Sequence, residues 1–282
     1  MLLTILQSLR PKQWVKNLLI FIPLIFSREF LSLDSLKLVA STFGIFCLIA
    51  SGIYLMNDIF DKKSDAKHPN KKHRAIASGK LSISAGVFLS LLFLSASFFC
   101  AWRLNPILVN VLLAYLVLQI SYSSYFKHIA ILDLIFIAIG FILRIFAGGV
   151  VISVEISNWL LAITFLLALL LASGKRLREI EIQGDSSRKV LKDYSPDFLK
   201  SAIKILLPTI LVSYLLYSFQ ANNSPNFILT VPIVVFGLLR YLLLIEQKTA
   251  SENPTDLLFE DKPLLASMII WIIAVTGILI HT

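Results

Sequence analysis

The sequence has little charge and almost no cysteine. Asp, Glu, Lys and Arg make up 15% of its 282 residues, below the roughly 25% of an average soluble protein. So low a charge content excludes a disordered protein and a coiled coil, because both are rich in charged residues. The two cysteines, Cys47 and Cys100, stand alone inside apolar stretches. We therefore expect neither a disulfide framework nor a zinc site.

Apolar residues take the place of the missing charges. They make up 57% of the chain, and the mean hydropathy is +0.82, whereas soluble proteins are roughly 45–50% apolar. This excess argues against a soluble enzyme and indicates a protein of the lipid bilayer. A net charge of +9 could indicate nucleic-acid binding in a soluble chain. In a membrane protein, the relevant question is instead on which side of the membrane the Lys and Arg residues lie. We expect no nucleic-acid partner.

Several apolar stretches are long enough for a membrane-spanning helix of about 20 residues. A weaker stretch near the N-terminus reaches that length only if it extends over residues 14–30, and a turn at residues 222–225 divides the run 205–239 into two helices. The sequence thus predicts an all-α polytopic membrane protein with about nine spans, forming a single domain over residues 1–282. The other predicted spans are 38–56, 81–102, 104–126, 134–154, 156–174 and 263–282.

The basic residues predict the orientation, because Lys and Arg in short loops stay on the cytoplasmic side. With nine spans, 22 of the 26 basic residues lie on one side, Arg144 lies within a span, and only Arg28, Lys37 and Arg103 lie on the other side. We therefore expect a cytoplasmic N-terminus, an external C-terminus and a multi-pass protein of the cell (plasma) membrane. Its polar chemistry would be on the cytoplasmic face.

Four polar residues, Asn57, Asp58, Asp61 and Asp65, follow the second span. If the helix continues, the three aspartates share one face, and their carboxylates repel unless a cation lies among them. Mg²⁺ fits, since it binds one or two carboxylates and completes its coordination with water or substrate phosphate. A solvated acidic helix end is the alternative, but ionisable residues at the mouth of a span favour a functional site.

Two charged segments are candidates for phosphate binding. Loop 67–80 is basic, and its Arg74 could hold phosphate through paired hydrogen bonds, although membrane topology and anionic lipid explain most of its lysines. The sixth span leads into Lys175, Arg176 and Glu179. Lys175 and Glu179 are four residues apart, so they form either a simple surface ion pair or part of a phosphate and metal site.

The span at 134–154 contains a charged residue, Arg144, near the middle of the membrane. An arginine there is costly unless it faces a polar cavity or a partner. Asp133 lies about three helical turns earlier on the same face. Contact of Arg144 with a substrate and pairing with a buried carbonyl group both remain open.

These motifs resemble the UbiA-type intramembrane prenyltransferase superfamily over nearly the whole chain. The motif Asn57-Asp58-x-x-Asp61-x-x-x-Asp65 is the main element, and further segments resemble one branch, the decaprenyl-phosphate phosphoribosyltransferases. Where ordinary members carry a second aspartate-rich motif, this chain has Lys175-Arg176-x-x-Glu179, whose positive charge fits a donor with more phosphate than a prenyl diphosphate. The branch-like segments are 10–17, 73–79 (with Ala75 where the branch usually has proline), 122–127, 174–179, 194–196, 254–256 and 261–263.

The resemblance implies a bundle of helices with a Mg²⁺ cofactor. The reaction would transfer 5-phosphoribosyl from phosphoribosyl diphosphate to a polyprenyl, decaprenyl-like phosphate and release diphosphate. Asn57, Asp58 and Asp61 would bind Mg²⁺ and diphosphate, with Asp65 as a weaker metal ligand, and Asp58, Asp61, Lys175 and Glu179 would be catalytic. The residues expected to hold phosphates are Lys16, Arg74, Lys127, Lys175 and Arg176; those expected to position the ribose or metal are Tyr122, Asp133 and Glu179.

Two alternative functions and the assembly state stay open at this point. The first alternative is transfer of a prenyl group to an aromatic or other acceptor at the same Mg²⁺ site. The second is transport of an anionic metabolite, since transporters also place charges inside the membrane. Arg144 is kept as a candidate for substrate contact, membrane lipid is an expected partner, and a homo-oligomer is compatible with the sequence.

Overall fold

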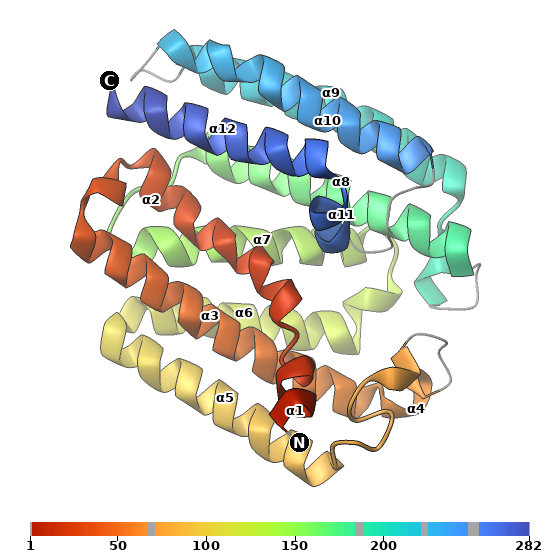
Figure 1. Cartoon of the computed structure of the whole chain (residues 1–282). Helices are drawn as coiled ribbons and strands as arrows, with labels where there is room; N and C mark the ends of the chain where they lie inside the picture. The colour runs from red at the N-terminus through yellow and green to blue at the C-terminus, as the bar shows by residue number, and fades with distance from the viewer. Residues whose placement is uncertain (1, 67–70, 184–188, 221–224, 248–253, 282) are drawn as a thin grey trace. The chain divides into compact units, whose positions relative to one another are not determined.

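The computed structural model, drawn in Figure 1, describes residues 2–66, 71–183, 189–220, 225–247 and 254–281. Over these residues the chain is helical and contains no strand, as predicted. Eight helices are long and apolar enough to cross a membrane. They are α3 (Leu33–Phe60), α5 (Ile83–Leu104), α6 (Pro106–Ser124), α7 (Leu132–Val151), α8 (Asn158–Gln183), α9 (Pro196–Gln220), α10 (Val231–Glu246) and α12 (Lys262–Ile280).

These eight helices match eight of the nine predicted spans. Ser32 and Ser82 cap the N-termini of α3 and α5, because each serine hydroxyl accepts a hydrogen bond from the backbone N–H three residues on. The predicted turn at 222–225 lies mostly outside the described residues. On its two sides, α9 ends at Gln220 and the 3₁₀ helix η7 (Pro225–Thr230) leads into α10.

The first predicted span is not one continuous α-helix. After α1 (Leu2–Ser8), the 3₁₀ helix η1 (Pro11–Phe21) leads into the short helix α2 (Ile22–Phe26). Pro23 lacks the N–H that an α-helix passing through this junction would use. Since a 3₁₀ helix rises about 2.0 Å per residue, η1 and α2 together extend about 30 Å, similar to the hydrocarbon core of a bilayer. The ninth span and the side of the N-terminus stay predictions.

The chain divides into two compact units, each made of two stretches of sequence. Unit 1 comprises Met1–Ser124 and Leu143–Glu155, and unit 2 comprises Tyr125–Ile142 and Ile156–Thr282. Helix α7 therefore contributes its first half to unit 2 and its second half to unit 1. The prediction of a single domain stays a prediction.

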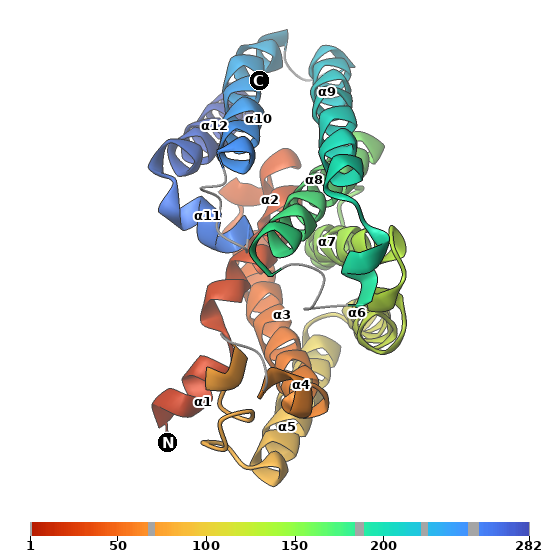
Figure 2. The ribbon, with the colours of Figure 1, turned by 90° about the vertical axis from the view of Figure 1, so that its right-hand side faces the viewer.

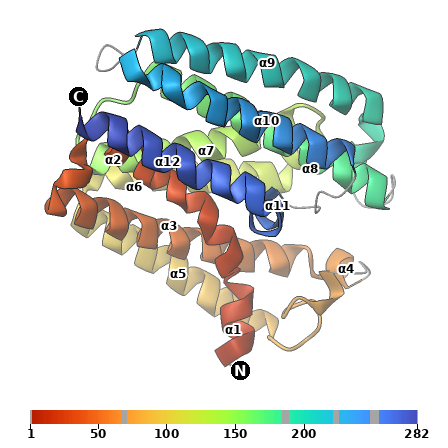
Figure 3. The same cartoon turned by 45° about the horizontal axis from the view of Figure 1, so that its top comes forward.

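In unit 1, α3 packs along α5 and against η1, as Figures 1 and 3 show. Phe46, Ile49 and Leu112 are in its buried core. The backbone of η1 comes very close to α7, since a Cβ atom added at Gly148 would lie 2.0 Å from the carbonyl oxygen of Ile20. Only glycine permits this approach, which holds the N-terminal segment in place.

In unit 2, α8 packs against α9, and α10 packs beside α12, as Figures 1 and 2 show. Leu170, Leu199 and Ile203 lie in the core of this unit. The short helix α11 (Pro254–Glu260) precedes α12, whose N-terminus is capped by the carboxylate of Asp261 accepting from the N–H of Leu264.

Candidate functional site

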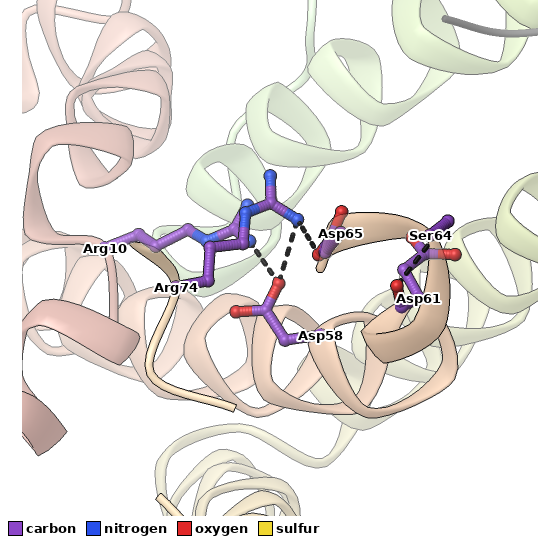
Figure 4. A network of polar contacts seen from close by, with 6 residues as sticks. All are labelled: Arg10, Asp58, Asp61, Ser64, Asp65 and Arg74. Atoms are coloured by element: carbon purple, nitrogen blue, oxygen red, sulfur yellow. Dashed lines mark hydrogen bonds and ion pairs between the residues drawn. The ribbon is translucent and has the colours of Figure 1, made fainter. Parts of the chain in front are cut away.

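The C-terminal end of α3 does not continue straight through the aspartate motif. The helix ends at Phe60, Asp61 has φ −87° and ψ 4°, and the one-turn helix α4 (Lys62–Asp65) follows. The continuous helix on which a shared face of all three aspartates depended is therefore not formed. Figure 4 shows the carboxylates of Asp58 and Asp65 beside the same guanidinium group, whereas Asp61 lies with Ser64 away from it.

Two arginines and two aspartates form an ion network, which we call the arginine–aspartate cluster: Arg10, Asp58, Asp65 and Arg74. The Nη1 atom of Arg74 donates to Asp58 Oδ1 at 3.1 Å and to Asp65 Oδ2 at 2.7 Å. Arg10 binds the same Oδ1 atom of Asp58. The two aspartates are only 3% and 4% exposed. Buried carboxylates require such partners, because an unpaired buried charge is very costly.

Arg10 is a member of this cluster to which the sequence assigned no role. Its backbone is left-handed, with φ 53° and ψ 59°, at the junction of α1 and η1. Its guanidinium lies 5.0 Å from the centroid of the Tyr54 ring, a cation–π arrangement. Burial lowers the pKa of the Arg10 guanidinium, and Asp58 opposes that shift. The only signal for Arg10 in the sequence was its place in segment 10–17.

Arg74 is held at the cluster by the packing of its loop. Ile76, two residues later, is buried in a small core with Leu9, Leu55 and Leu81. The loop closes on itself where the N–H of Leu81 donates to Ala75 O at 2.9 Å. Gly79, at φ 77°, makes the turn between them, a conformation that glycine adopts without strain. Of the predicted loop, residues 67–70 lie outside the described part of the chain.

The donor atoms of the cluster suit a hard divalent cation. No three acidic, histidine or cysteine side chains gather as a metal site among the residues that the structure describes. Asp58 and Asp65 nevertheless converge on one cationic group, Arg74. Two carboxylates are enough for Mg²⁺, which takes one or two from a protein and the rest of its ligands from water and phosphate. The residues therefore fit Mg²⁺, with Asp58 and Asp65 best placed and the Asn57 and Asp61 ligands still predictions.

A second buried network, the α8 cluster, lies in unit 2 and consists of Asp133, Arg176, Glu179 and Tyr194. Arg176 Nε donates to Asp133 Oδ2 at 2.7 Å, and its Nη1 atom donates to Glu179 Oε2 at 2.5 Å. The Tyr194 hydroxyl donates to Asp133 Oδ1 at 2.5 Å. Asp133 is fully buried and Arg176 is 1% exposed. Direct contact of Asp133 and Arg176 with substrate stays a prediction, since the structure shows them bound to other side chains of the protein.

Lys175 is the accessible cation beside the α8 cluster. Its side chain is 26% exposed, and its Nζ atom lies 3.9 Å from Glu179 Oε1, the pair expected from their spacing. The sequence had pointed to Tyr194 only as a member of the branch-like segment 194–196. Burial, together with its hydrogen bond to Asp133, raises the pKa of the Tyr194 hydroxyl, so this group stays protonated at neutral pH.

Arg144 lies in a buried network of unit 1. Its Nε atom donates to Asn17 Oδ1 and its Nη2 atom to Tyr115 Oη, each at 2.8 Å. Asn17 in turn donates to Cys47 Sγ at 3.4 Å. These contacts join α7 to η1 and α6, and they supply the polar surroundings that an arginine inside a membrane requires. Contact of Arg144 with a substrate stays a prediction.

The remaining predicted site residues lie outside these three networks. Asn57 and Tyr122 are partly exposed near the ends of α3 and α6 in unit 1, and Lys16 is partly exposed within η1. Lys127 lies in unit 2 in the 3₁₀ helix η4 (Phe126–His128). Their substrate contacts remain predictions.

Comparison with known proteins places this arrangement among membrane transferases. Residues 18–259 match the model of the UbiA prenyltransferase family. The chain is 30% identical to the decaprenyl-phosphate phosphoribosyltransferase of Mycolicibacterium smegmatis, over 95% of this chain and 90% of that protein. It is 31% identical to the decaprenyl-phosphate phosphoribosyltransferase of Corynebacterium glutamicum, over 96% of this chain and 85% of that protein.

Solved structures agree on the fold. A UbiA homologue from Archaeoglobus fulgidus, bound to DMAPP and Mg²⁺, superimposes with a TM-score of 0.74 over 99% of this chain and all of that one. The sequences are 19% identical. Together with the eight apolar helices, this likeness establishes a multi-pass membrane protein with the predicted fold.

Proposed function

Because the chain belongs to the UbiA prenyltransferase family, we propose that it transfers 5-phosphoribosyl from phosphoribosyl diphosphate to a polyprenyl phosphate. The observation that carries this assignment is identity of 30% and 31% over nearly the full length of two decaprenyl-phosphate phosphoribosyltransferases. The Lys175-Arg176-x-x-Glu179 segment supports it, since it adds positive charge suited to a donor rich in phosphate.

In this reaction an oxygen of the lipid phosphate forms a bond to C1 of the ribose, and the bond from C1 to the diphosphate oxygen breaks. The attacking oxygen is already anionic near neutral pH, so no strong general base is needed. The main barrier is the departure of diphosphate with its developing negative charge. The protein must therefore neutralise that charge and hold the donor in line with the lipid phosphate.

The arginine–aspartate cluster is suited to the diphosphate end of the donor. Asp58 and Asp65 would hold Mg²⁺, with Asn57 and Asp61 as further oxygen ligands. When bound, this cation would neutralise charge on the leaving diphosphate. Arg10 and Arg74 would then bind phosphate oxygens, which guanidinium groups do through paired, charge-assisted hydrogen bonds. Arg10 is an addition that comes from the geometry of the cluster.

The α8 cluster has two kinds of member. Lys175 has an accessible amine, so we assign it to a phosphate of the donor and, with Glu179, to catalysis. Asp133 and Arg176 are buried and bound to one another, so they hold this end of α8 in shape. With Asp133 and Arg176, whose contact with substrate is also proposed, the set of substrate-binding residues is completed by Lys16, Tyr122, Lys127 and Arg144.

The distribution of charge and apolar surface supports proposals on where the reaction takes place, which lipid is the acceptor and how the donor enters. We place the reaction at the cytoplasmic face of the plasma membrane, where the basic residues are expected. The acceptor would be a decaprenyl-like phosphate whose tail lies along the apolar helices. A soluble donor would enter from the cytoplasm, and the protein would act alone or as a homo-oligomer.

Purified protein in detergent, supplied with Mg²⁺, tests the assignment. Phosphoribosyl diphosphate labelled in the ribose is incubated with polyprenyl phosphate, and the extracted lipid is analysed by mass spectrometry. The expected product is the acceptor enlarged by one phosphoribosyl group, with release of one diphosphate. A parallel reaction contains a prenyl diphosphate and an aromatic acceptor.

The outcomes separate the three functions considered. A labelled phosphoribosyl lipid supports the proposal. A prenylated acceptor without that lipid supports the alternative prenyl transfer. Absence of turnover with either diphosphate, together with uptake of an anionic metabolite by reconstituted vesicles, supports a transporter. The last two outcomes reject phosphoribosyl transfer.

A further inference from the structure

We propose that Tyr194 is a positioning residue of the transferase: it fixes Asp133 at the start of α7 and, through Asp133, the charged residues at the inner end of α8. This role rests on the proposed function, since it concerns donor binding by Lys175 and Glu179. Tyr194 lies between the 3₁₀ helix η6 (Lys189–Asp193) and α9, far along the sequence from the two residues that it binds.

The Tyr194 hydroxyl is both a hydrogen-bond donor and a hydrogen-bond acceptor. It donates its proton to Asp133 Oδ1 at 2.5 Å and accepts the backbone N–H of Ile131 at 2.5 Å. The direction is fixed, because an ionised carboxylate can only accept and a backbone N–H can only donate. One hydroxyl group therefore connects the turn before α7 to the carboxylate in the first turn of that helix.

The turn that Tyr194 binds is conformationally unfavourable. Ile131 has φ 70°, in the left-handed region, which a β-branched residue rarely adopts because its Cβ crowds the backbone. Its side chain is half exposed, so burial of that side chain does not explain the conformation. Such strain persists only where the surroundings compensate for it, and the Tyr194 hydroxyl is positioned to do so.

From Asp133 the contacts continue along one face of α8. Asp133 Oδ2 accepts from Arg176, Arg176 donates to Glu179, and Glu179 lies beside the accessible amine of Lys175. Removing the Tyr194 hydroxyl leaves one buried oxygen of Asp133 without that donor, so the carboxylate gains freedom to rotate away from Arg176. We therefore expect the change to reach Glu179 and Lys175.

A core tyrosine with a purely structural role offers a matched control. The hydroxyl of Tyr214, on α9 in the same unit, contacts the Thr230 hydroxyl at 2.6 Å and accepts from the Trp271 ring N–H at 2.8 Å. Tyr214 is as buried as Tyr194, at 5% exposure for each. Thr230 and Trp271, which hydrogen-bond to Tyr214, are neutral, whereas Tyr194 binds a carboxylate.

The experiment compares Tyr194→Phe with Tyr214→Phe in the full-length protein. We expect Tyr194→Phe to raise the KM for phosphoribosyl diphosphate about tenfold, a change typical of one hydrogen bond lost from a buried network. The kcat should fall as well, since Glu179 and Lys175 are also assigned to catalysis, but by a smaller factor, because neither side chain is removed. Tyr214→Phe should lower the Tm similarly but leave this KM within about twofold. Equal KM effects of the two variants would overturn the proposal.

A second substitution tests the strained turn itself. Glycine adopts φ 70° without a steric penalty, so Ile131→Gly should keep Asp133 in place without the tyrosine. Adding Ile131→Gly to Tyr194→Phe should therefore recover about half of the lost donor affinity on a logarithmic scale. Failure of this rescue would contradict a role through the turn.

Hydrogen exchange separates this inference from the proposed function. Tyr194→Phe should speed exchange in residues 129–135, which contain the Ile131 amide, whereas Tyr214→Phe should not. Unchanged exchange there overturns the positioning role, whatever the enzyme's activity. If exchange in residues 129–135 is faster in Tyr194→Phe but the wild-type protein makes no phosphoribosyl lipid, the proposed function is rejected and the contact between Tyr194 and the turn is still established.

Discussion

Arg74 Nη1 donates to Asp65 Oδ2 at 2.7 Å. The same nitrogen reaches Asp58 at 3.1 Å, so one guanidinium occupies the space between two carboxylates that would hold Mg²⁺. A metal ion and Arg74 would therefore compete for the same oxygens. Bound at Asp58 and Asp65, Mg²⁺ would neutralise these carboxylates, and Arg74 would then be available to bind phosphate.

This competition predicts opposite effects of Arg74→Gln on metal and donor. Without donor, the variant should bind Mn²⁺, a stand-in for Mg²⁺, more tightly by about threefold to tenfold, because a cationic competitor has been removed. Binding of phosphoribosyl diphosphate should weaken about tenfold or more, since a charge-assisted hydrogen bond to phosphate is lost. Electron paramagnetic resonance measures free Mn²⁺, and equilibrium dialysis measures the labelled donor.

Lys72→Gln is the control for Arg74→Gln. Lys72 is an exposed residue of the same loop, so its substitution removes one positive charge without touching the carboxylates. It should alter both affinities by less than about twofold. Equal effects of the two variants on Mn²⁺ binding would mean that long-range charge, and not direct competition, governs the metal site.

The close approach at Gly148 predicts a large loss of stability on Gly148→Ala. The added methyl group would meet the Ile20 carbonyl oxygen at 2.0 Å, which forces η1 away from α7. We expect the free energy of unfolding to fall by about 1–3 kcal/mol, because an added group in a closely packed interface forces the backbone to shift. Gly44→Ala on α3 is the control, because no atom lies within 4 Å of the added group. Thermal unfolding in detergent should show a lower Tm for Gly148→Ala than for the wild type, and an unchanged Tm for Gly44→Ala. Equal Tm values for the two variants would contradict the close packing at Gly148.

The ion pair between Arg240 and Asp261 predicts a loss of stability in acid. Two hydrogen bonds, of 3.1 and 2.7 Å, join the guanidinium to the carboxylate. The bond from Arg240 lowers the pKa of Asp261, and the Leu264 N–H assists. The pKa of this group is thus lower in the folded than in the unfolded protein, so the stability it contributes is present above about pH 4 and is lost as the pH falls through the folded pKa.

Asp261→Asn checks this pH dependence. The variant should be less stable than the wild type by about 1 kcal/mol at pH 7, and the difference should shrink as the pH is lowered toward about 3. Thermal unfolding of both proteins over this pH range provides the measurement. Parallel Tm profiles would show that the carboxylate does not contribute through its charge.

Much of the fold could be predicted from the sequence because the relevant pattern is local. Each apolar run predicts one helix by its length alone, and eight helices follow the predicted ranges. The N-terminal segment was harder, since its departure from an α-helix depends on Pro23 and on contacts of Gly148 and Arg144 with η1. Those contacts join residues that are far apart in the sequence.

The sequence could predict which residues belong to the candidate site, but not which of them contact one another. Spacing identified the aspartates, yet it placed Asp61 on the face of Asp58, because the end of α3 at Phe60 leaves no periodic signal. The bonds from Arg10 to Asp58 and from Tyr194 to Asp133 are long-range pairings. A single sequence contains no information that links such partners.

Phosphoribosyl transfer would depend on a divalent cation held at Asp58, which would neutralise the leaving diphosphate. The most direct test measures phosphoribosyl transfer by purified wild-type and Asp58→Asn proteins over a range of Mg²⁺ concentrations, after thermal unfolding has shown that both are folded. We predict that wild-type turnover requires Mg²⁺ and that Asp58→Asn loses at least about a hundredfold at every concentration. Turnover that persists in excess chelator, or an Asp58→Asn protein as active as the wild type, would contradict the account.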